Sequence, residues 1–254
     1  MLHLFCSAVT LSIGAAIVLA ASIPDGTWPA SQGRVSFAEV YVVESGQVFD
    51  GGMKTYDRSD ITCLEQTESN VSTAVFEVKP GATLRNVIIG KNQMEGGNAS
   101  SVSRVIGGGA RYADDKVIQH NGYGTVVVDG FFAQDFGKLY RSCGNCKSNP
   151  AQRFLVMSNI YADLNVIQTK RSGKNTSIVM MNGNFGDHAV LRNIHVKPNP
   201  LGNFTECASS RVVNISGAKP LVLSNGPNIP VCVYSNEDVH IIQTHEQQKK
   251  LCAY

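Results

Sequence analysis

The chain of 254 residues is long enough for one substantial hydrophobic core, and no Pro-rich, Ser-rich or charged linker divides it. Its formal net charge of +2 is too small to indicate a nucleic-acid or membrane partner, so electrostatic recognition must come from local clustering of charges. These properties favour a single domain, which we expect to be a monomer.

The first residues of the chain form an apolar run that ends in the small residues Ala20 and Ala21. This pattern predicts a signal peptide over residues 1–21. The alternative is a membrane anchor, but the apolar run Leu11–Ala21 is shorter than the roughly 20 residues that a spanning helix needs. We therefore expect a secreted, extracellular protein that has no contact with a membrane once the signal is removed.

The cysteines and the glycosylation triplets are consistent with secretion. Cys6 would leave with the signal, and an even number would remain, which indicates disulfides. Asn-x-Ser/Thr triplets, which predict exposed loops, begin at Asn70, Asn98, Asn175, Asn203 and Asn214. Cys143 and Cys146 form a CxxC motif, but no second CxxC or nearby His pair completes a zinc site, so we expect a structural role.

Short β-rich runs recur along the chain, whereas few segments have a helical period; the runs are AVFEV, TLRNVII, RVIGGG, GTVVVDGFF, FLVMSNIY, IVMMN and AVLRNIHV. Four of these runs align on an Asn or Asp, and a fifth carries a Gly at that place; these residues are Asn86, Gly108, Asp129, Asn159 and Asn193. The shortest steps between them are about 21 to 22 residues, which suits one coil of a parallel β-helix. Asn and Asp suit its bends because they tolerate left-handed backbone.

An antiparallel sandwich is the alternative fold. It predicts hairpin turns between paired strands, and Asn121-Gly122 and Asn182-Gly183 are candidates for such turns. The pattern alone leaves this alternative open.

Three cations lie in the central β-rich stretch. Lys116 and Lys138 are about one coil apart, so they would lie in matching positions at the roughly 4.8 Å spacing of paired strands. Their repulsion must be offset, either by water around two spread side chains or by an acidic ligand, to which Arg141 would add bidentate recognition of a carboxylate. Asp114 and Asp135 have a similar spacing and indicate either a parallel acidic ladder or simple charge compensation.

Several motifs resemble the secreted pectate lyases of polysaccharide lyase family 3, with oomycete and fungal members closest; they are FDGG, YDR, GATLRNVIIGKNQMEG, ADDKVIQHNG, DFGKLYRSCGNC and NGNFGDHAVLRN. The resemblance implies a single-stranded right-handed parallel β-helix over residues 22–235, followed by a tail over residues 236–254 that is either a peripheral strand or a loose end. It also implies calcium-assisted β-elimination of polygalacturonate, the de-esterified chain of pectin.

Site residues follow from the same resemblance. Lys116, Lys138 and Arg141 match the family's catalytic and substrate-binding cations, and His120 is a further candidate for lining the cleft. These groups and Ca²⁺ would hold the uronate carboxylate and stabilise the charge that develops when a base removes the C5 proton. Physical chemistry favours Lys116 as that base and Arg141 for charge stabilisation, because a lysine crowded by cations loses its proton more easily than arginine does. The resemblance also permits the reverse assignment.

The resemblance breaks between GKNQMEG and RVIGGG, where the family carries a further coil with acidic calcium ligands and this chain has only GNASSVS. The interval around the gap is still one coil, so we expect that a whole repeat is absent and that its neighbours stack directly. Glu95, Asp114 and Asp115 remain as metal candidates, but a cation that takes six to eight oxygens should bind weakly without the lost carboxylates.

The resemblance also suggests disulfide partners for the remaining cysteines. Cys63 and Cys232 look like partners that tie the first coil to the C-terminal segment, and Cys252 either pairs with Cys207 or is free.

Three hypotheses remain, and they belong to different functional classes. The first is an active pectate lyase; the second is an impaired β-solenoid that still binds polygalacturonate; the third is a structural surface glycoprotein with no affinity for uronides. Lys116→Ala separates the first two, because it should abolish turnover in one and only weaken binding in the other.

Overall fold

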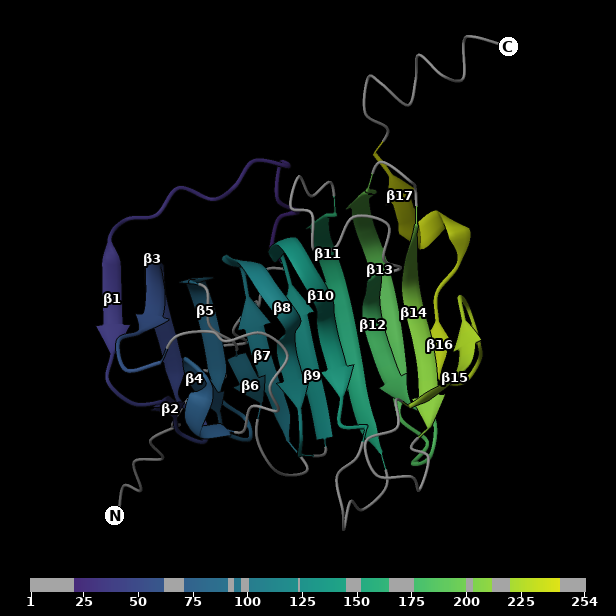
Figure 1. The fold of residues 1–254 in the computed structure, drawn as a ribbon, viewed down its shortest axis with the longest axis horizontal. Helices are drawn as coiled ribbons and strands as arrows, with labels where there is room; N and C mark the ends of the chain where they lie inside the picture. The colour runs from purple at the N-terminus through teal and green to yellow at the C-terminus, as the bar shows by residue number, and fades with distance from the viewer. Residues whose placement is uncertain are drawn as a thin grey trace, which may run out of the picture.

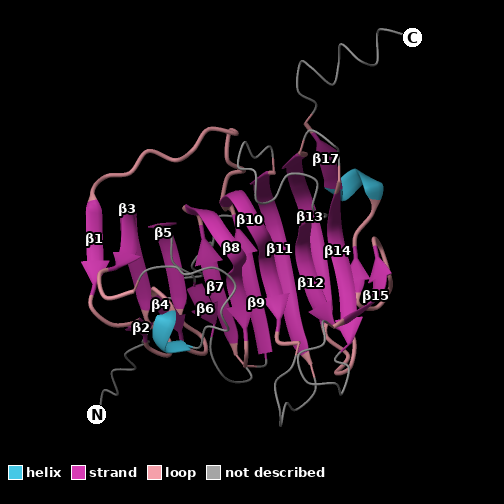
Figure 2. Cartoon of the chain, in the orientation of Figure 1, coloured by secondary structure: helices cyan, strands magenta, loops and turns pink. Residues whose placement is uncertain are grey.

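The computed structural model is an all-β solenoid with its strands stacked side by side along one long axis (Figure 1). It describes residues 21–61, 71–90, 94–96, 101–122, 124–144, 152–164, 176–199, 203–211 and 220–242. Within these ranges the helical elements are two short 3₁₀ turns, and all other regular structure is strand (Figure 2). None of the helices in the described part is long and apolar enough to cross a membrane.

The strands are β1 (Arg34–Phe37), β2 (Tyr41–Val43), β3 (Val48–Arg58), β4 (Phe76–Val78), β5 (Thr83–Ile89), β6 (Met94–Gly96), β7 (Val102–Ile106), β8 (Gly109–His120), β9 (Gly124–Asp129), β10 (Phe132–Ser142), β11 (Arg153–Asp163), β12 (Thr176–Asn182), β13 (His188–Lys197), β14 (Phe204–Arg211), β15 (Leu221–Asn225), β16 (Cys232–Val233) and β17 (Val239–Ile241). The 3₁₀ turns are η1 (Val71–Thr73) and η2 (Asn236–Asp238).

Strand pairing divides the coils into three parallel faces. Face A runs through β2, β4, β6, the second half of β8, the second half of β10, β12 and β14. Face B runs from the first half of β3 through β5, β7, β9, β11 and β13 to β16. Face C joins β1 to the second halves of β3 and β5, the first halves of β8 and β10, the second halves of β11 and β13, and β17. These parallel ladders confirm the predicted β-helix, and the sandwich alternative is wrong.

The bend from face B to face C repeats with a left-handed residue in successive coils. The ladder register brings five residues with positive φ to the same level, namely Asn86, Gly107, Gly130, Asn159 and Asn193. The sequence alignment is therefore right for the three asparagines. It is displaced by one residue at Gly108 and Asp129, because the neighbouring glycine takes the left-handed position in both coils.

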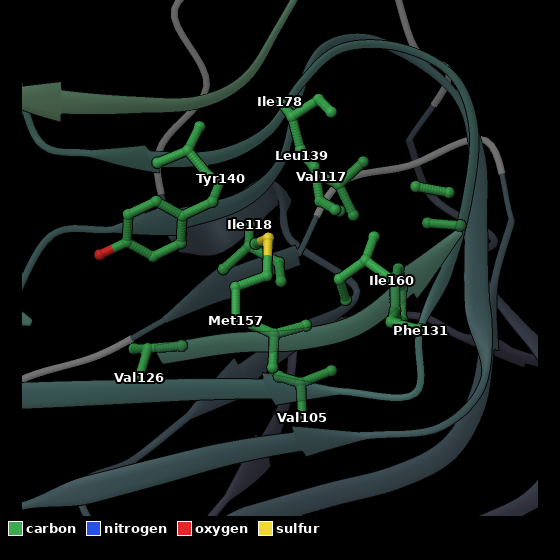
Figure 3. Close-up of a cluster of buried hydrophobic side chains, with 14 of the residues drawn as sticks. Val105, Val117, Ile118, Val126, Phe131, Leu139, Tyr140, Met157, Ile160 and Ile178 are labelled. Atoms are coloured by element: carbon green, nitrogen blue, oxygen red, sulfur yellow. The ribbon is translucent and has the colours of Figure 1, made fainter. Parts of the chain in front are cut away.

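Stacked apolar side chains fill the interior of the coils (Figure 3). On face B, Val105 pairs with Val128, Val128 with Met157, and Met157 with Leu191, and these side chains are at most 6% exposed. Each fully buried side chain of this size stabilises the fold by about 1.5–3 kcal/mol. The core is thus a column that runs through every coil, which holds the strands of the neighbouring faces in register.

The coils on both sides of the expected gap stack directly. Strand β6 pairs with β4 and with β8, and β7 pairs with β5 and with β9. The solenoid is therefore continuous at this point, as expected if a whole repeat is absent.

The C-terminal end differs from the sequence-based expectation at two places. Cys232 is bonded to Cys207, with an Sγ–Sγ distance of 1.95 Å, so the expected pairing with Cys63 is wrong and Cys207 does not pair with Cys252. Strand β17 pairs in parallel with β13, so the tail begins as a peripheral strand. Cys63, Cys146 and Cys252 lie outside the described residues, as does the signal segment up to residue 20.

Candidate functional site

A β-bulge on face A brings the predicted cations together. Strand β8 has two residues, Asp114 and Asp115, between Ala113 and Lys116, whereas β10 has only Gly137 at the corresponding position, between Phe136 and Lys138. Beyond the bulge, Lys138 pairs with Lys116. The lysines therefore lie side by side on adjacent coils, and the extra residue in β8 redirects the neighbouring aspartates, as bulges near active sites commonly do.

Asp115 lies between the two lysines and offsets their repulsion. Its carboxylate contacts Lys116 Nζ directly, and its Oδ1 lies 3.3 Å from Lys138 Nζ. The three side chains are 24–28% exposed, so they remain reachable from solvent. Burial alone would raise the pKa of the Asp115 carboxyl, but the two lysines outweigh burial and hold that pKa below its usual value. Asp115 is thus a counter-ion, which the sequence analysis had considered only as a metal ligand.

Arg141 follows Lys138 by three residues on β10 and is 7% exposed. Its Nη1 donates a hydrogen bond to the Ser210 hydroxyl on β14, at 2.9 Å. Among the described residues, no carboxylate lies within ion-pair distance of its guanidinium. Burial lowers the pKa of Arg141 to about 10, although the charges of Asp115 and Asp187 act in the opposite direction. Burial likewise lowers the pKa of Lys138, against the raising effect of Asp115.

The predicted metal site at Glu95, Asp114 and Asp115 stays a prediction, because only the two aspartates have described side chains. Glu95 lies on β6, and its backbone pairs with Gln119, which in turn pairs with Arg141; its side chain is outside the description. Asp115 is already bound by two lysines. Within the described residues, no group of three His, Cys, Asp or Glu side chains is placed to hold a metal ion.

Two further expectations need correction. The predicted acidic ladder does not form, because Gln134 pairs with Arg111 and Phe136 with Ala113, which leaves Asp135 level with Tyr112 rather than with Asp114. His120 does not line the cleft, because its side chain is only 1% exposed and its Nδ1 forms a hydrogen bond of 2.6 Å with the Tyr140 hydroxyl.

Ser210 is the residue of the site that sequence reasoning missed. It comes from β14, far along the chain, and reaches Arg141 across the intervening strand β12. No local motif marks it, and only the register of three strands brings it to the guanidinium. The CxxC motif is structural in part, since Cys143 is 2% exposed and disulfide-bonded.

Comparison with known proteins places this site in context. The family profile described as "Pectate lyase" matches residues 25–99 and 97–211, in two segments that meet where the family's further coil is expected to be absent. Pectate lyase H of Emericella nidulans is 39% identical over 231 residues, or 82% of each chain. Probable pectate lyase D of Aspergillus fumigatus is 36% identical over an alignment 256 positions long, which covers 91% of this chain and 98% of that protein.

Solved structures share the fold. Pectate lyase PelI from Erwinia chrysanthemi, in complex with tetragalacturonic acid, aligns with a TM-score of 0.52 and 20% identity, covering 84% of this chain and 71% of that chain. Pectate lyase Pel3 from Pectobacterium carotovorum aligns with a TM-score of 0.53 and 21% identity, covering 89% and 74% respectively. At these identities the similarity shows that the fold, a β-helix, is shared.

Proposed function

The chain belongs to the pectate lyase family, and on that premise we propose that it cleaves polygalacturonate by β-elimination at Lys116, Lys138 and Arg141. The observation that carries this proposal is the pairing of the two lysines on adjacent coils, with Arg141 on the same strand as Lys138. A polymer with one carboxylate per sugar matches cations repeated at the roughly 4.8 Å spacing of strands. The family and the fungal relatives support the same substrate class.

The reaction requires a base near the C5 hydrogen of a uronate. The base removes the C5 proton, the electron pair of that C–H bond forms the C4–C5 double bond, and the C4–O bond breaks as the leaving oxygen takes up a proton. Positive charge beside the uronate carboxylate stabilises the charge that develops on it. Water is not consumed, and one product carries an unsaturated uronide.

We assign the base to Arg141 and carboxylate binding to the two lysines, which reverses the roles favoured from sequence. Lys116 is in direct contact with the Asp115 carboxylate, which occupies the nitrogen that would have to accept the proton. Arg141 donates to a neutral hydroxyl, and burial brings its pKa to about 10, closer to the range in which a base exchanges protons effectively. The two lysine side chains are 24–28% exposed, so they are accessible to the substrate.

Calcium does not fit the described side chains as a complete site. A hard cation takes six to eight oxygen ligands, and the carboxylate of Asp115 already contacts two lysines. The roles above therefore rest on the chain's own cations. The predicted signal peptide and the fungal relatives support an extracellular location, where plant cell-wall pectin would be the substrate.

The test is the absorbance of the unsaturated uronide when purified protein meets polygalacturonate, across pH and with calcium or chelator. We expect turnover that rises with pH and levels near pH 10, because Arg141 must lose its proton to act as a base. Arg141→Ala should abolish turnover. The matched control is Lys197→Ala, a cation of face C that pairs with Asp163, and it should leave the rate unchanged.

Binding of polygalacturonate is measured in parallel on the same proteins. Folded wild-type protein that binds the polymer but produces no unsaturated uronide at any pH or calcium concentration would contradict the lyase proposal. It would instead establish the impaired solenoid, and an absence of binding would establish a structural glycoprotein.

A further inference from the structure

The chain directly after Arg141 is fixed by a buried polar network that the proposed reaction does not use. We propose that the segment Ser142–Gly144 is a template that fixes the position of the Arg141 guanidinium, with Gly144 as the residue in contact and Asn182 as the clamp. This inference rests on the proposed function, because it concerns the group assigned as the base. Its members would be positioning residues, which act on the substrate only through Arg141.

Asn182, the last residue of β12, is fully buried, and its N–H, Nδ2 and Oδ1 all form hydrogen bonds. Its N–H donates to the Ser142 hydroxyl at 2.6 Å, and its Nδ2 donates to the Cys143 carbonyl at 2.6 Å and to the Gly144 carbonyl at 3.4 Å. Its Oδ1 accepts from the N–H of Asn184 at 2.9 Å. Asn182 thus holds Ser142 through its backbone N–H, and Cys143 and Gly144 through its side chain.

Asp187 also contacts this segment, through Ser142. It is 1% exposed, and the Ser142 hydroxyl donates a hydrogen bond to its carboxylate. Its Oδ1 accepts from the N–H of Arg153 at 2.9 Å, and its Oδ2 lies 3.6 Å from Arg153 Nη1. A buried ion pair of this kind is a poor source of net stability, but it specifies one arrangement of the groups around it.

Gly144 lies so close to the guanidinium that no side chain fits between them. A Cβ added to Gly144 would be 2.1 Å from Arg141 Nη2 and 3.1 Å from Arg141 Cζ. Gly144 does not have a positive φ, so the backbone itself would accept alanine. A glycine is therefore required at this position by the close contact with Arg141, and not by the backbone conformation. Ser210 binds Nη1 of the guanidinium, and Gly144 adjoins Nη2.

The test compares Gly144→Ala with Gly183→Ala, whose added methyl group would meet the end of the exposed Leu223 side chain. We expect Gly144→Ala to lower kcat about 100-fold with KM within about threefold, because a displacement of about 1 Å in a reacting group has effects of this size. Its pH–rate profile should shift to higher pH as the displaced guanidinium becomes better solvated. Gly183→Ala should match the wild type in both respects.

The effect must pass through Arg141, which a double-mutant cycle tests. In an Arg141→Lys background the shorter cation leaves room for the methyl group, so Gly144→Ala should lower kcat by less than about threefold. Asn182→Ala provides a second route to the same loss if Gly144→Ala does not fold. A folded Gly144→Ala protein with wild-type kcat, or an equal loss in the Arg141→Lys background, would overturn the proposal.

A readout without turnover separates this proposal from the lyase assignment. Proton exchange at Arg141 Nε is measured by nuclear magnetic resonance, and its signal is identified by its absence in Arg141→Lys. We expect exchange at least about tenfold faster in Gly144→Ala than in the wild type, since a released guanidinium reaches water. Equal exchange rates would overturn the template even if the wild type is an active lyase. If exchange is faster in Gly144→Ala than in the wild type, but the wild type shows no turnover, the result would support the template and contradict the proposed function.

Discussion

Asp115 shows how one residue sets the electrostatics of the site. Two lysines on adjacent strands repel each other, and a carboxylate placed between them turns that repulsion into two ion pairs. The same charge acts on the neighbouring strand β10, where it opposes the lowering of the pKa of Lys138 and of Arg141 by burial. The bulge in β8 is what directs Asp115 into this position.

Replacing Asp115 with asparagine should therefore change both the pH profile and the affinity for substrate. Without the negative charge, the pKa of Lys138 and of Arg141 falls further, so the rising limb of the pH–rate profile moves to lower pH. KM for polygalacturonate should fall about threefold, the scale of a partly exposed charge interaction. Steady-state kinetics from pH 6 to about 11 check both expectations.

Asp114→Asn is the matched control, because Asp114 lies in the same bulge and no shift of the pKa of Lys138 or of Arg141 is attributed to it. Its profile should follow that of the wild type. An Asp115→Asn profile that moves to higher pH would contradict this account of the site.

At the scale of elements, what could be predicted follows from rules that repeat with the coil. Asparagine at successive bends is visible in sequence because left-handed backbone restricts residue type, and Asn86, Asn159 and Asn193 were found in this way. The bulge was not predicted, since one extra residue in β8 has no signature in composition and changes the register by one on only part of the strand. The Arg141–Ser210 contact was missed because it depends on the register of three strands at once.

The bend at Asn159 provides a prediction for this scale. Its φ is 54°, its Nδ2 donates to Asp129 Oδ1 at 2.7 Å, and its Oδ1 accepts from Asn193 Nδ2 at 2.7 Å. Asn159→Ala should lower the free energy of unfolding by about 2–4 kcal/mol, from left-handed strain of about 1–2 kcal/mol and the lost hydrogen bonds. Asn159→Gly loses the bonds without the strain and should be less destabilised. Urea unfolding of both variants checks the order, and an alanine variant at least as stable as the glycine variant would contradict it.

At the scale of the whole molecule, a solenoid has the weakness that each coil contacts mainly its neighbours. The N-terminal strap, residues 22–33, crosses several coils on the outside of the strands (Figure 1). The N–H of Gln32 donates to the Met53 carbonyl at 2.9 Å, and the Thr55 hydroxyl donates to the Ser31 hydroxyl at 2.7 Å. Contacts that bridge coils far apart in sequence should make the coils unfold together.

Trp28 is the main side-chain anchor of this strap. Its ring meets Phe132 edge-on, with centroids 5.7 Å apart, and the guanidinium of Arg111 lies 4.3 Å from its ring centroid. Trp28→Ala should lower the free energy of unfolding by about 2 kcal/mol, from an aromatic pair of about 0.5–1.5 kcal/mol and a cation–π contact of about 0.5–1 kcal/mol, with a smaller m-value because the coils lose a common tie.

Trp28→Phe keeps the edge-on ring contact and weakens the cation–π contact, so its free energy of unfolding should lie between those of the alanine variant and the wild type.

Urea unfolding followed by circular dichroism and by fluorescence is the measurement, with tyrosine emission used for the variants because Trp28 is the single tryptophan. If the strap ties the coils together, the two probes coincide in the wild type and separate in Trp28→Ala, since coils released from the strap unfold at different denaturant concentrations. Coincident transitions with an unchanged m-value in Trp28→Ala would mean that the continuous core column alone makes the solenoid cooperative.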